Sequence, residues 1–209
     1  MELTFYDFAP SSAAYRVRIA LNLKGVEARR VNVNLTEGEQ STPDYLAINP
    51  QGLIPALAVD GQVISQSLAI IDWLDSQFPQ PRLIPAEPLA RARVIGLALE
   101  VGADIHPLNN LRVQKYLRNE LGVGKQGVSS WVAHWMTTGF AALERVAPDE
   151  GLFGGDQPNL ADVFLVPQMA NARRSAVPTQ AFPKLERIDA AARALDAFAR
   201  AAPDAVKAD

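Results

Sequence analysis

The stretch from Pro10 to Leu21 reads PSSAAYRVRIAL and begins an expected helix directly after an expected strand. Apolar residues at 17, 20 and 21 give this helix a buried stripe. Its first turn combines the hydroxyls of Ser11 and Ser12 with unbonded backbone N–H groups and the positive end of the helix dipole. Such a helix start favours an anion, and a thiolate would suit it. Both serines are also ordinary helix caps in proteins that bind nothing there, so the motif alone leaves two interpretations open.

The rest of the first 80 residues alternates strand and helix patterns. Gly25 is expected to end the first helix, and Asp60-Gly61 predicts a tight turn between two antiparallel strands. Strands are expected at 2–6, 28–35, 56–59 and 62–65, a short helical piece at 44–47, and another helix beginning at Gln66 or Ser67. A strand, a helix and a second strand parallel to the first form a β-α-β unit, which indicates an α/β domain.

The composition excludes several kinds of protein. No run approaches 18 apolar residues and no signal peptide is recognisable, so we expect no membrane association and a cytoplasmic location. The chain has no cysteine, and His106 and His134 cannot form a zinc site without carboxylates, so no metal is expected. Any thiol chemistry therefore needs a thiol brought by a ligand. A net charge of −3 argues against nucleic acid but permits a small anionic ligand.

Proline-rich sequence separates the first 80 residues from a helical second half. We expect a first domain at 1–80, a stiff linker at 81–87 and an all-helical domain at 88–209. The expected helices are 89–118, interrupted near Pro107, then 128–146, 160–176 and 184–200. Asn159 and Asp162 have the spacing of a helix capping box, for which we expect a structural role.

A thioredoxin-like half followed by an all-helical half resembles a cytosolic glutathione S-transferase over nearly the whole chain. In that fold a cis proline precedes the third strand, and Pro55 occupies this position. Residues 11–21 (SSAAYRVRIAL), 66–71 (QSLAII) and 166–168 (VPQ) resemble the zeta class of the family, and residues 104–110 (DIHPLNN) resemble its bacterial maleylpyruvate isomerases. Pro10, Ala13 and Ala14 depart from the class pattern, which has arginine, cysteine and serine there.

The resemblance implies that glutathione is the cofactor and binds mainly to the first domain. Ser11, with Ser12 as an alternate, would stabilise its thiolate, because helix N-termini and hydroxyl donors lower a thiol pKa. Gln66 and Ser67 would hold its γ-glutamyl carboxylate. Further cofactor contacts are expected from Gln40, Ile54, His106 and Asn110. His106 stands before a proline, where a structural histidine is an equally good interpretation.

The implied activity is isomerisation of a maleyl-type dicarboxylate to its fumaryl form, with Ser11, Ser12 and Arg174 as catalytic residues. Carboxylates call for arginine, so Arg174, Arg112 and Arg16 are the expected substrate contacts. Arg18 is interpreted as surface charge.

Two other functions stay open from the sequence: a transferase that conjugates or dehalogenates small electrophiles, and a glutathione-transferase-like binding module without turnover. Retention of Ser11, Gln66, Ser67 and Arg174 together argues against the binding module, because a scaffold needs none of them. The expected partners are glutathione, a small anionic substrate and a second copy of the chain in a homodimer.

Overall fold

The computed structural model describes residues 1–206, and these divide into two compact units. The first unit comprises Met1–Arg82 together with the segment that begins at Ala194, and the second comprises Leu83–Arg193. The predicted domains differ from this division at the C-terminal end, where residues from 194 onward were expected to belong to the helical domain.

Within the described residues, four strands of the first unit form one mixed sheet in the order β2-β1-β3-β4. β1 pairs with β2 in parallel and with β3 in antiparallel orientation, and β3 pairs with β4 in antiparallel orientation. The positive φ angles of Asp60 and Gly61, 46° and 84°, confirm the predicted tight turn between β3 and β4. The bounds are β1 Leu3–Asp7, β2 Arg29–Asn32, β3 Ala56–Val59 and β4 Gln62–Ser65.

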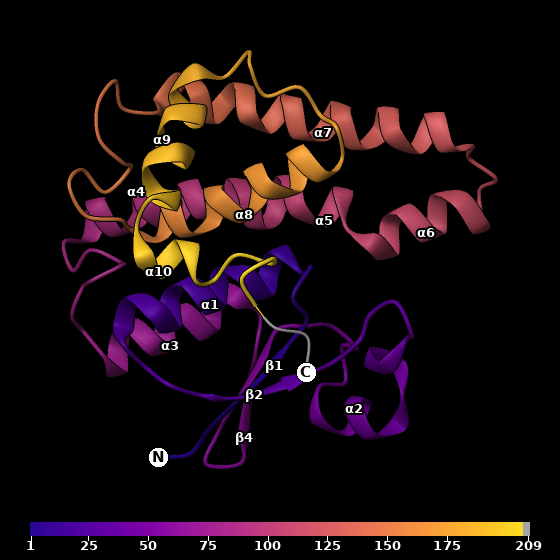
Figure 1. The fold of residues 1–209 in the computed structure, drawn as a ribbon, viewed down its shortest axis with the longest axis horizontal. Coiled ribbons are helices and arrows are strands. Elements are labelled where there is room, and N and C mark those ends of the chain that lie inside the picture. The colour runs from indigo at the N-terminus through magenta and orange to yellow at the C-terminus, as the bar shows by residue number, and fades with distance from the viewer. Residues whose placement is uncertain (207–209) are drawn as a thin grey trace. The chain divides into compact units, whose positions relative to one another are not determined.

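The two longer helices of the first unit, α1 (Ser12–Lys24) and α3 (Ser67–Gln77), pack against each other over the sheet (Figure 1). Gly25 ends α1 in the left-handed conformation with φ 63°, as predicted. Lys24 and Asp75 form a buried ion pair of 2.6 Å between the two helices. Two short elements, η1 (Glu39–Ser41) and α2 (Pro43–Ile48), follow β2 and lie beside the sheet, away from α1 and α3.

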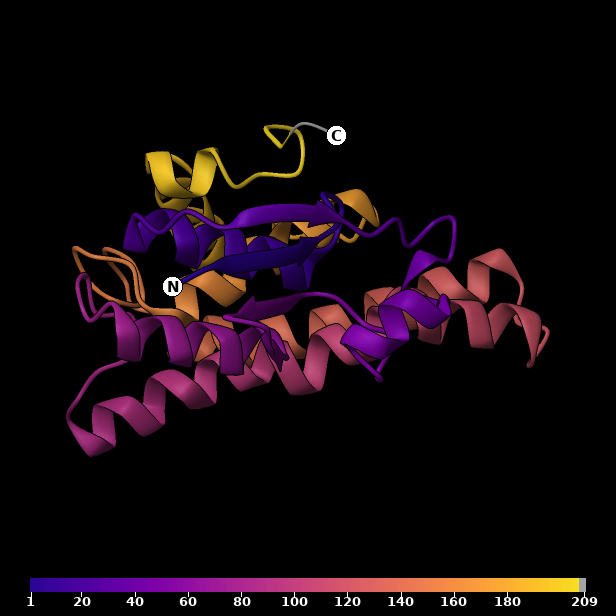
Figure 2. The ribbon, with the colours of Figure 1, turned by 90° about the horizontal axis from the view of Figure 1, so that it is seen from below.

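The expected helix 184–200 is in fact two helices, because the backbone turns extended at Leu195 with ψ 132°. α9 (Pro183–Arg193) belongs to the second unit, and α10 (Asp196–Ala199) packs against α1 (Figure 1); Figure 2 shows the same neighbours from below. Side chains of α1 bind the carbonyls of this last segment: Tyr15 Oη donates to Phe198 O at 3.3 Å, and Asn22 Nδ2 donates to Ala197 O at 2.8 Å.

The second unit is helical, and α8 is its central element. α8 packs against α4 and α9, and 12 of its 15 residues are buried. The predicted interruption near Pro107 is confirmed, and a π-helix, labelled η2, precedes it. The bounds are α4 Pro88–Leu99, η2 Glu100–Ile105, α5 His106–Asn109, α6 Leu111–Asn119, α7 Lys125–Val146 and α8 Leu160–Arg174.

The capping box at the start of α8 is confirmed. Asn159 Oδ1 accepts from Ala161 N at 2.8 Å, and the buried Asp162 carboxylate accepts from the backbone N–H groups of Phe153, Gly154 and Asn159 at 2.9 to 3.1 Å. Burial raises the Asp162 pKa to about 6, although these hydrogen bonds act in the opposite direction. Leu83 O accepts from Leu160 N at 2.9 Å, so the predicted linker is packed into the second unit from Leu83 onward.

Candidate functional site

Ser11 caps helix α1 and keeps a hydroxyl proton available. Its Oγ accepts from Ala14 N at 3.2 Å, which uses a lone pair and leaves the O–H group able to donate. Ser11 is half-buried, whereas Ser12 is 6% exposed. Ser11 therefore caps the helix and can also donate its hydroxyl to a bound anion. Because Ser11 is more exposed than Ser12, its hydroxyl is more accessible to such a ligand.

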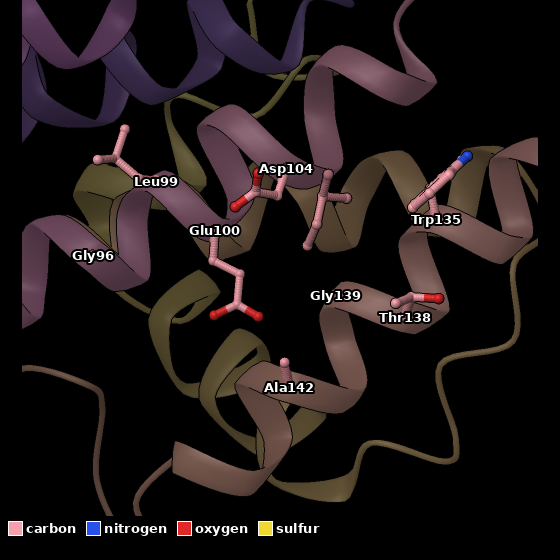
Figure 3. A pocket seen from close by; sticks show the side chains of 9 residues that line it. Gly96, Leu99, Glu100, Asp104, Trp135, Thr138, Gly139 and Ala142 are labelled. Atoms are coloured by element: carbon pink, nitrogen blue, oxygen red, sulfur yellow. The ribbon is translucent and has the colours of Figure 1, made fainter.

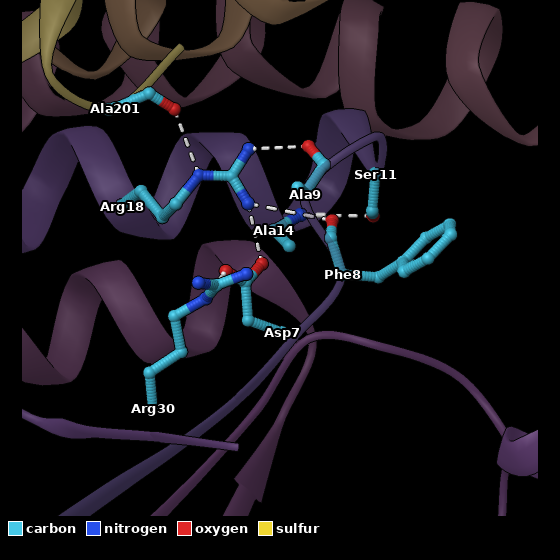
Figure 4. Close-up of polar contacts among 8 residues, drawn as sticks. All are labelled: Asp7, Phe8, Ala9, Ser11, Ala14, Arg18, Arg30 and Ala201. Carbon is cyan, nitrogen blue, oxygen red and sulfur yellow. Dashed lines mark hydrogen bonds and ion pairs between the residues drawn. The ribbon is translucent and has the colours of Figure 1, made fainter. Parts of the chain in front are cut away.

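Arg18 holds the segment that leads into Ser11, as Figure 4 shows. Its Nη1 forms an ion pair of 2.5 Å with the buried Asp7, its Nη2 donates to Ala9 O at 2.8 Å, and its Nε donates to Ala201 O at 2.9 Å. Arg18 is only 6% exposed, so its interpretation as surface charge is wrong. One guanidinium thus joins the end of β1, the loop before Ser11 and the C-terminal segment.

The start of α3 provides a second group of donors. Gln66 has a positive φ of 72° and is exposed, and its Nε2 donates to Gln51 Oε1 at 2.9 Å. Ser67 is buried, and its Oγ accepts from Arg16 Nη1 at 3.3 Å. Because a cation already occupies an acceptor position of this hydroxyl, its proton is directed towards another acceptor. A carboxylate at the N-terminus of the helix would serve as that acceptor.

Arg16 lies inside the first unit and is 2% exposed. Burial lowers its pKa to about 9. The structure thus places this expected substrate contact beside Ser67, within the group of residues expected to hold the cofactor, where its positive charge supports an anion at the start of α3.

Residues of the loops beside α2 fit an extended peptide ligand. The Ile54–Pro55 peptide bond is cis, as predicted, and Ile54 is buried. Among the described residues, the buried Gln40 Oε1 has no hydrogen-bond partner. A Cβ added to Gly52 would lie 3.1 Å from the Gln40 carbonyl oxygen, so η1 and the loop that follows α2 approach closely. Hydroxyls, a buried cation and this amide together suit the carboxylate and peptide groups of glutathione.

The second unit holds the remaining predicted residues. His106 is half-buried at the start of α5, and Asn110 caps α6 by accepting from Val113 N at 3.2 Å. Arg112 is exposed on the first turn of α6. Asn110 therefore has a capping role in addition to any ligand contact.

Arg174 is the last residue of α8 and is exposed, and partial burial lowers its pKa. Its Nη2 donates to Asn171 Oδ1 at 2.7 Å. The neighbouring Arg173 instead forms an ion pair of 2.8 Å with the buried Asp189. Sequence reasoning missed Asn171, although an asparagine within a largely apolar helix is a usable signal.

A cavity of about 360 Å³ lies in the second unit between η2 and α7 (Figure 3). Glu100, Asp104, Trp135 and Thr138 are among its lining residues. Burial and, to a smaller extent, the Asp104 charge raise the Glu100 pKa. Two carboxylates make this cavity unsuitable for an anionic substrate, so it is not the expected substrate site.

No group of three or more potential metal ligands occurs among residues 1–206. No helix in this part of the chain is long and apolar enough to cross a membrane.

Comparisons with known proteins agree with this arrangement. Residues 10–77 match the family model described as the N-terminal domain of glutathione S-transferase. The chain is 45% identical over 207 residues to a maleylpyruvate isomerase of Ralstonia sp, and the match covers 97% of this chain and 98% of the relative.

Two solved structures are similar over almost their whole length. A maleylpyruvate isomerase described as a bacterial zeta-class glutathione S-transferase in its holo form has a TM-score of 0.94 and 44% identity, with 97% of this chain and 98% of that chain covered. A maleylacetoacetate isomerase from Methylobacterium extorquens, with bound malonate and glutathione, has a TM-score of 0.91 and 38% identity, with 98% of each chain covered.

Proposed function

Since the chain belongs to the zeta class of the glutathione S-transferase family, we propose that it is a glutathione-dependent isomerase of a maleyl-type dicarboxylate. Its substrate is maleylpyruvate or maleylacetoacetate, and its product is the fumaryl isomer. The observation that carries the proposal is the 45% identity over nearly the full length to a relative named for this reaction. The similar structure with bound malonate and glutathione supports both the cofactor and the dicarboxylate class of the substrate.

The first unit holds the cofactor. Ser67, backed by Arg16, and the backbone N–H groups at the start of α3 bind the γ-glutamyl carboxylate, and Gln66 and Gln40 add polar contacts. The hydroxyl of Ser11 would donate a hydrogen bond to the sulfur and, with the positive end of α1, would lower the pKa of the thiol. Bound glutathione supplies a thiolate that adds reversibly to the activated double bond, permits rotation and is then released unchanged.

The second unit binds the substrate. Arg174 binds a substrate carboxylate and stabilises the negative charge that develops towards the carbonyl end of the substrate. Arg112 is a second cation for the same purpose. These positive groups stabilise the transition state more than the ground state, because the additional negative charge at the carbonyl end of the dicarboxylate develops only during reaction.

Substitutions of Ser11 and Arg174 test this division of roles. Arg174→Ala is expected to raise KM and lower kcat for the dicarboxylate by at least tenfold, while calorimetry shows glutathione affinity within about twofold of wild type. Ser11→Ala is expected to raise the pKa of bound glutathione by about one to two units, as for a lost hydrogen bond to a charged group. Full isomerase activity in Arg174→Ala, or an unchanged thiol titration in Ser11→Ala, contradicts the role assigned to that residue.

A conjugating or dehalogenating transferase is the competing function, and it would use the same thiolate. It differs in that glutathione is consumed or bonded to the product. A non-catalytic module is disfavoured because the matched relatives are named as enzymes.

We also propose that the protein acts as a homodimer in the cytoplasm, as the family resemblance implies. The first unit of one subunit would face the second unit of the other. Light scattering at micromolar concentration is expected to give twice the chain mass of 22.6 kDa, and a single-chain mass contradicts the dimer.

A further inference from the structure

Two asparagines form a hydrogen-bonded chain from Arg174 into the interior of the second unit. Arg174 Nη2 donates to Asn171 Oδ1 at 2.7 Å, and Asn171 Nδ2 donates to Asn109 Oδ1 at 2.9 Å. Asn109 Nδ2 in turn donates to Ile105 O at 2.7 Å. Asn109 and Asn171 are 2% and 7% exposed, so water hardly competes for the two inner bonds.

The groups at the two ends of this series of hydrogen bonds fix the direction in which every bond is donated. The carbonyl of Ile105 only accepts, so the amide of Asn109 must turn its NH₂ group towards it. That leaves Asn109 Oδ1 to receive the NH₂ group of Asn171, and Asn171 Oδ1 to face Arg174. A guanidinium only donates, so the last bond also fits. Reversal of either amide would oppose two donors or two acceptors in a buried place.

The inner end of the chain is fixed by packing. Ile105 is the last residue of η2 and is fully buried. Its side chain lies against α7 at Gly139, where an added Cβ would come within 2.3 Å of it; Figure 3 shows η2 beside this glycine. Asn109 is held a second time, because its carbonyl accepts from Gln114 Nε2 at 2.7 Å. Arg174 is therefore oriented from a rigid part of the unit.

The contact with Asn171 orients Arg174 without neutralising it. An amide oxygen is an uncharged acceptor, so this bond leaves the positive charge of the guanidinium in place. Arg173, by contrast, is bonded to the Asp189 carboxylate. A flexible arginine loses side-chain entropy when it binds a carboxylate, and prior orientation reduces this loss.

We propose that Asn171 and Asn109 are positioning residues that hold Arg174 oriented for a substrate carboxylate through uncharged acceptors, and so make the site selective for anionic substrates. The proposal rests on the substrate role of Arg174 put forward above.

Substitution of Asn171 separates orientation from charge. Asn171→Asp places a carboxylate against Arg174, so malonate affinity, measured by calorimetry with glutathione present, is expected to fall at least tenfold and KM for the dicarboxylate to rise by a similar factor. Asn171→Ala keeps the charge and loses the orientation, so a smaller loss of about three- to tenfold is expected. Glutathione affinity should stay within twofold in both variants.

Arg173→Gln is the matched control, because it lowers the charge beside Arg174 by the same one unit without touching the amide chain. Its malonate affinity is expected to stay within threefold of wild type. If Asn171→Asp does not fold, Asn109→Ala, which removes the inner link, should reduce malonate affinity three- to tenfold with glutathione binding intact.

The possible outcomes separate this proposal from the proposed function. If Arg174→Ala weakens malonate binding but the variants of Asn171 and Asn109 do not, the positioning role is refuted and the function stands. The positioning role is also refuted if Arg173→Gln weakens malonate binding as much as Asn171→Asp does. If Arg174→Ala leaves malonate binding unchanged, the substrate role of Arg174 fails first and the positioning role fails with it.

Discussion

Arg18→Met is expected to destabilise the protein strongly, because Arg18 is bonded to three separate segments. The substitution keeps an unbranched side chain of similar length and removes the guanidinium. Asp7, which is fully buried, loses one of its two ion pairs, and the carbonyls of Ala9 and Ala201 lose charged donors.

Removal of one partner from a buried ion pair costs about 3–5 kcal/mol. Asp7 keeps a second cation, because Arg30 Nε lies 2.6 Å from its other oxygen, so the ion-pair contribution lies at the low end of this range. The two carbonyls add a further loss that is not additive with the first. We therefore expect Arg18→Met to lower the free energy of unfolding by roughly 3–4 kcal/mol.

Urea unfolding followed by fluorescence measures this loss, with Arg30→Met as the matched control. Arg30 contacts the same carboxylate but its side chain is 20% exposed, so its removal should cost only about 1–2 kcal/mol. When Asp7→Asn is added to Arg18→Met, the free energy of unfolding should fall little further, because the Asp7 carboxylate has already lost one of its two cations. A loss below about 1 kcal/mol for Arg18→Met, or an equal loss for Arg30→Met, refutes the assigned role of Arg18.

Two further predictions concern the starts of α3 and α8. Ser67→Ala should weaken glutathione binding by about 1–2 kcal/mol, as measured by calorimetry. Ser76→Ala, at the exposed end of the same helix, should leave the affinity unchanged. If the two variants bind glutathione equally well, Ser67 is not part of the site. The folded-state pKa of Asp162, about 6, lies above its ordinary value of 3.8, so its stabilising contribution is complete below about pH 4 and is lost as the pH rises through 6. Between about pH 4 and a pH above 6, the free energy of unfolding of the wild-type protein should therefore fall by roughly 1–3 kcal/mol relative to that of Asp162→Asn. Parallel pH profiles of the two proteins would contradict the raised pKa of Asp162.

Local sequence signals predicted most of the fold. The turn at Asp60-Gly61, the end of α1 at Gly25 and the capping box of Asn159 each depend on a few adjacent residues, and the structure confirms them. The break at Leu195 was not predicted, because it depends on contacts with α1 that lie about 180 residues away in the sequence.

The candidate site shows the same limit. Ser11 and Ser67 could be identified because each stands at a helix start. Arg16 was expected to contact the substrate and Arg18 to be surface charge, since arginine is usually exposed. Their burial depends on partners on β1 and α3, which the sequence does not place beside them.

The amide chain behind Arg174 could not be predicted from the sequence either. Asn109 and Asn171 are separated by 62 residues and meet only when α5 and α8 have packed.

The amount of glutathione consumed per molecule of substrate tests the account most directly. Wild-type protein is mixed with maleylpyruvate or maleylacetoacetate and a hundredfold smaller amount of glutathione, and both the dicarboxylate and the free thiol are followed by NMR. The account predicts complete conversion to the fumaryl isomer with the glutathione signal unchanged at the end. Conversion that stops after one equivalent, with glutathione bonded to the product, would contradict it.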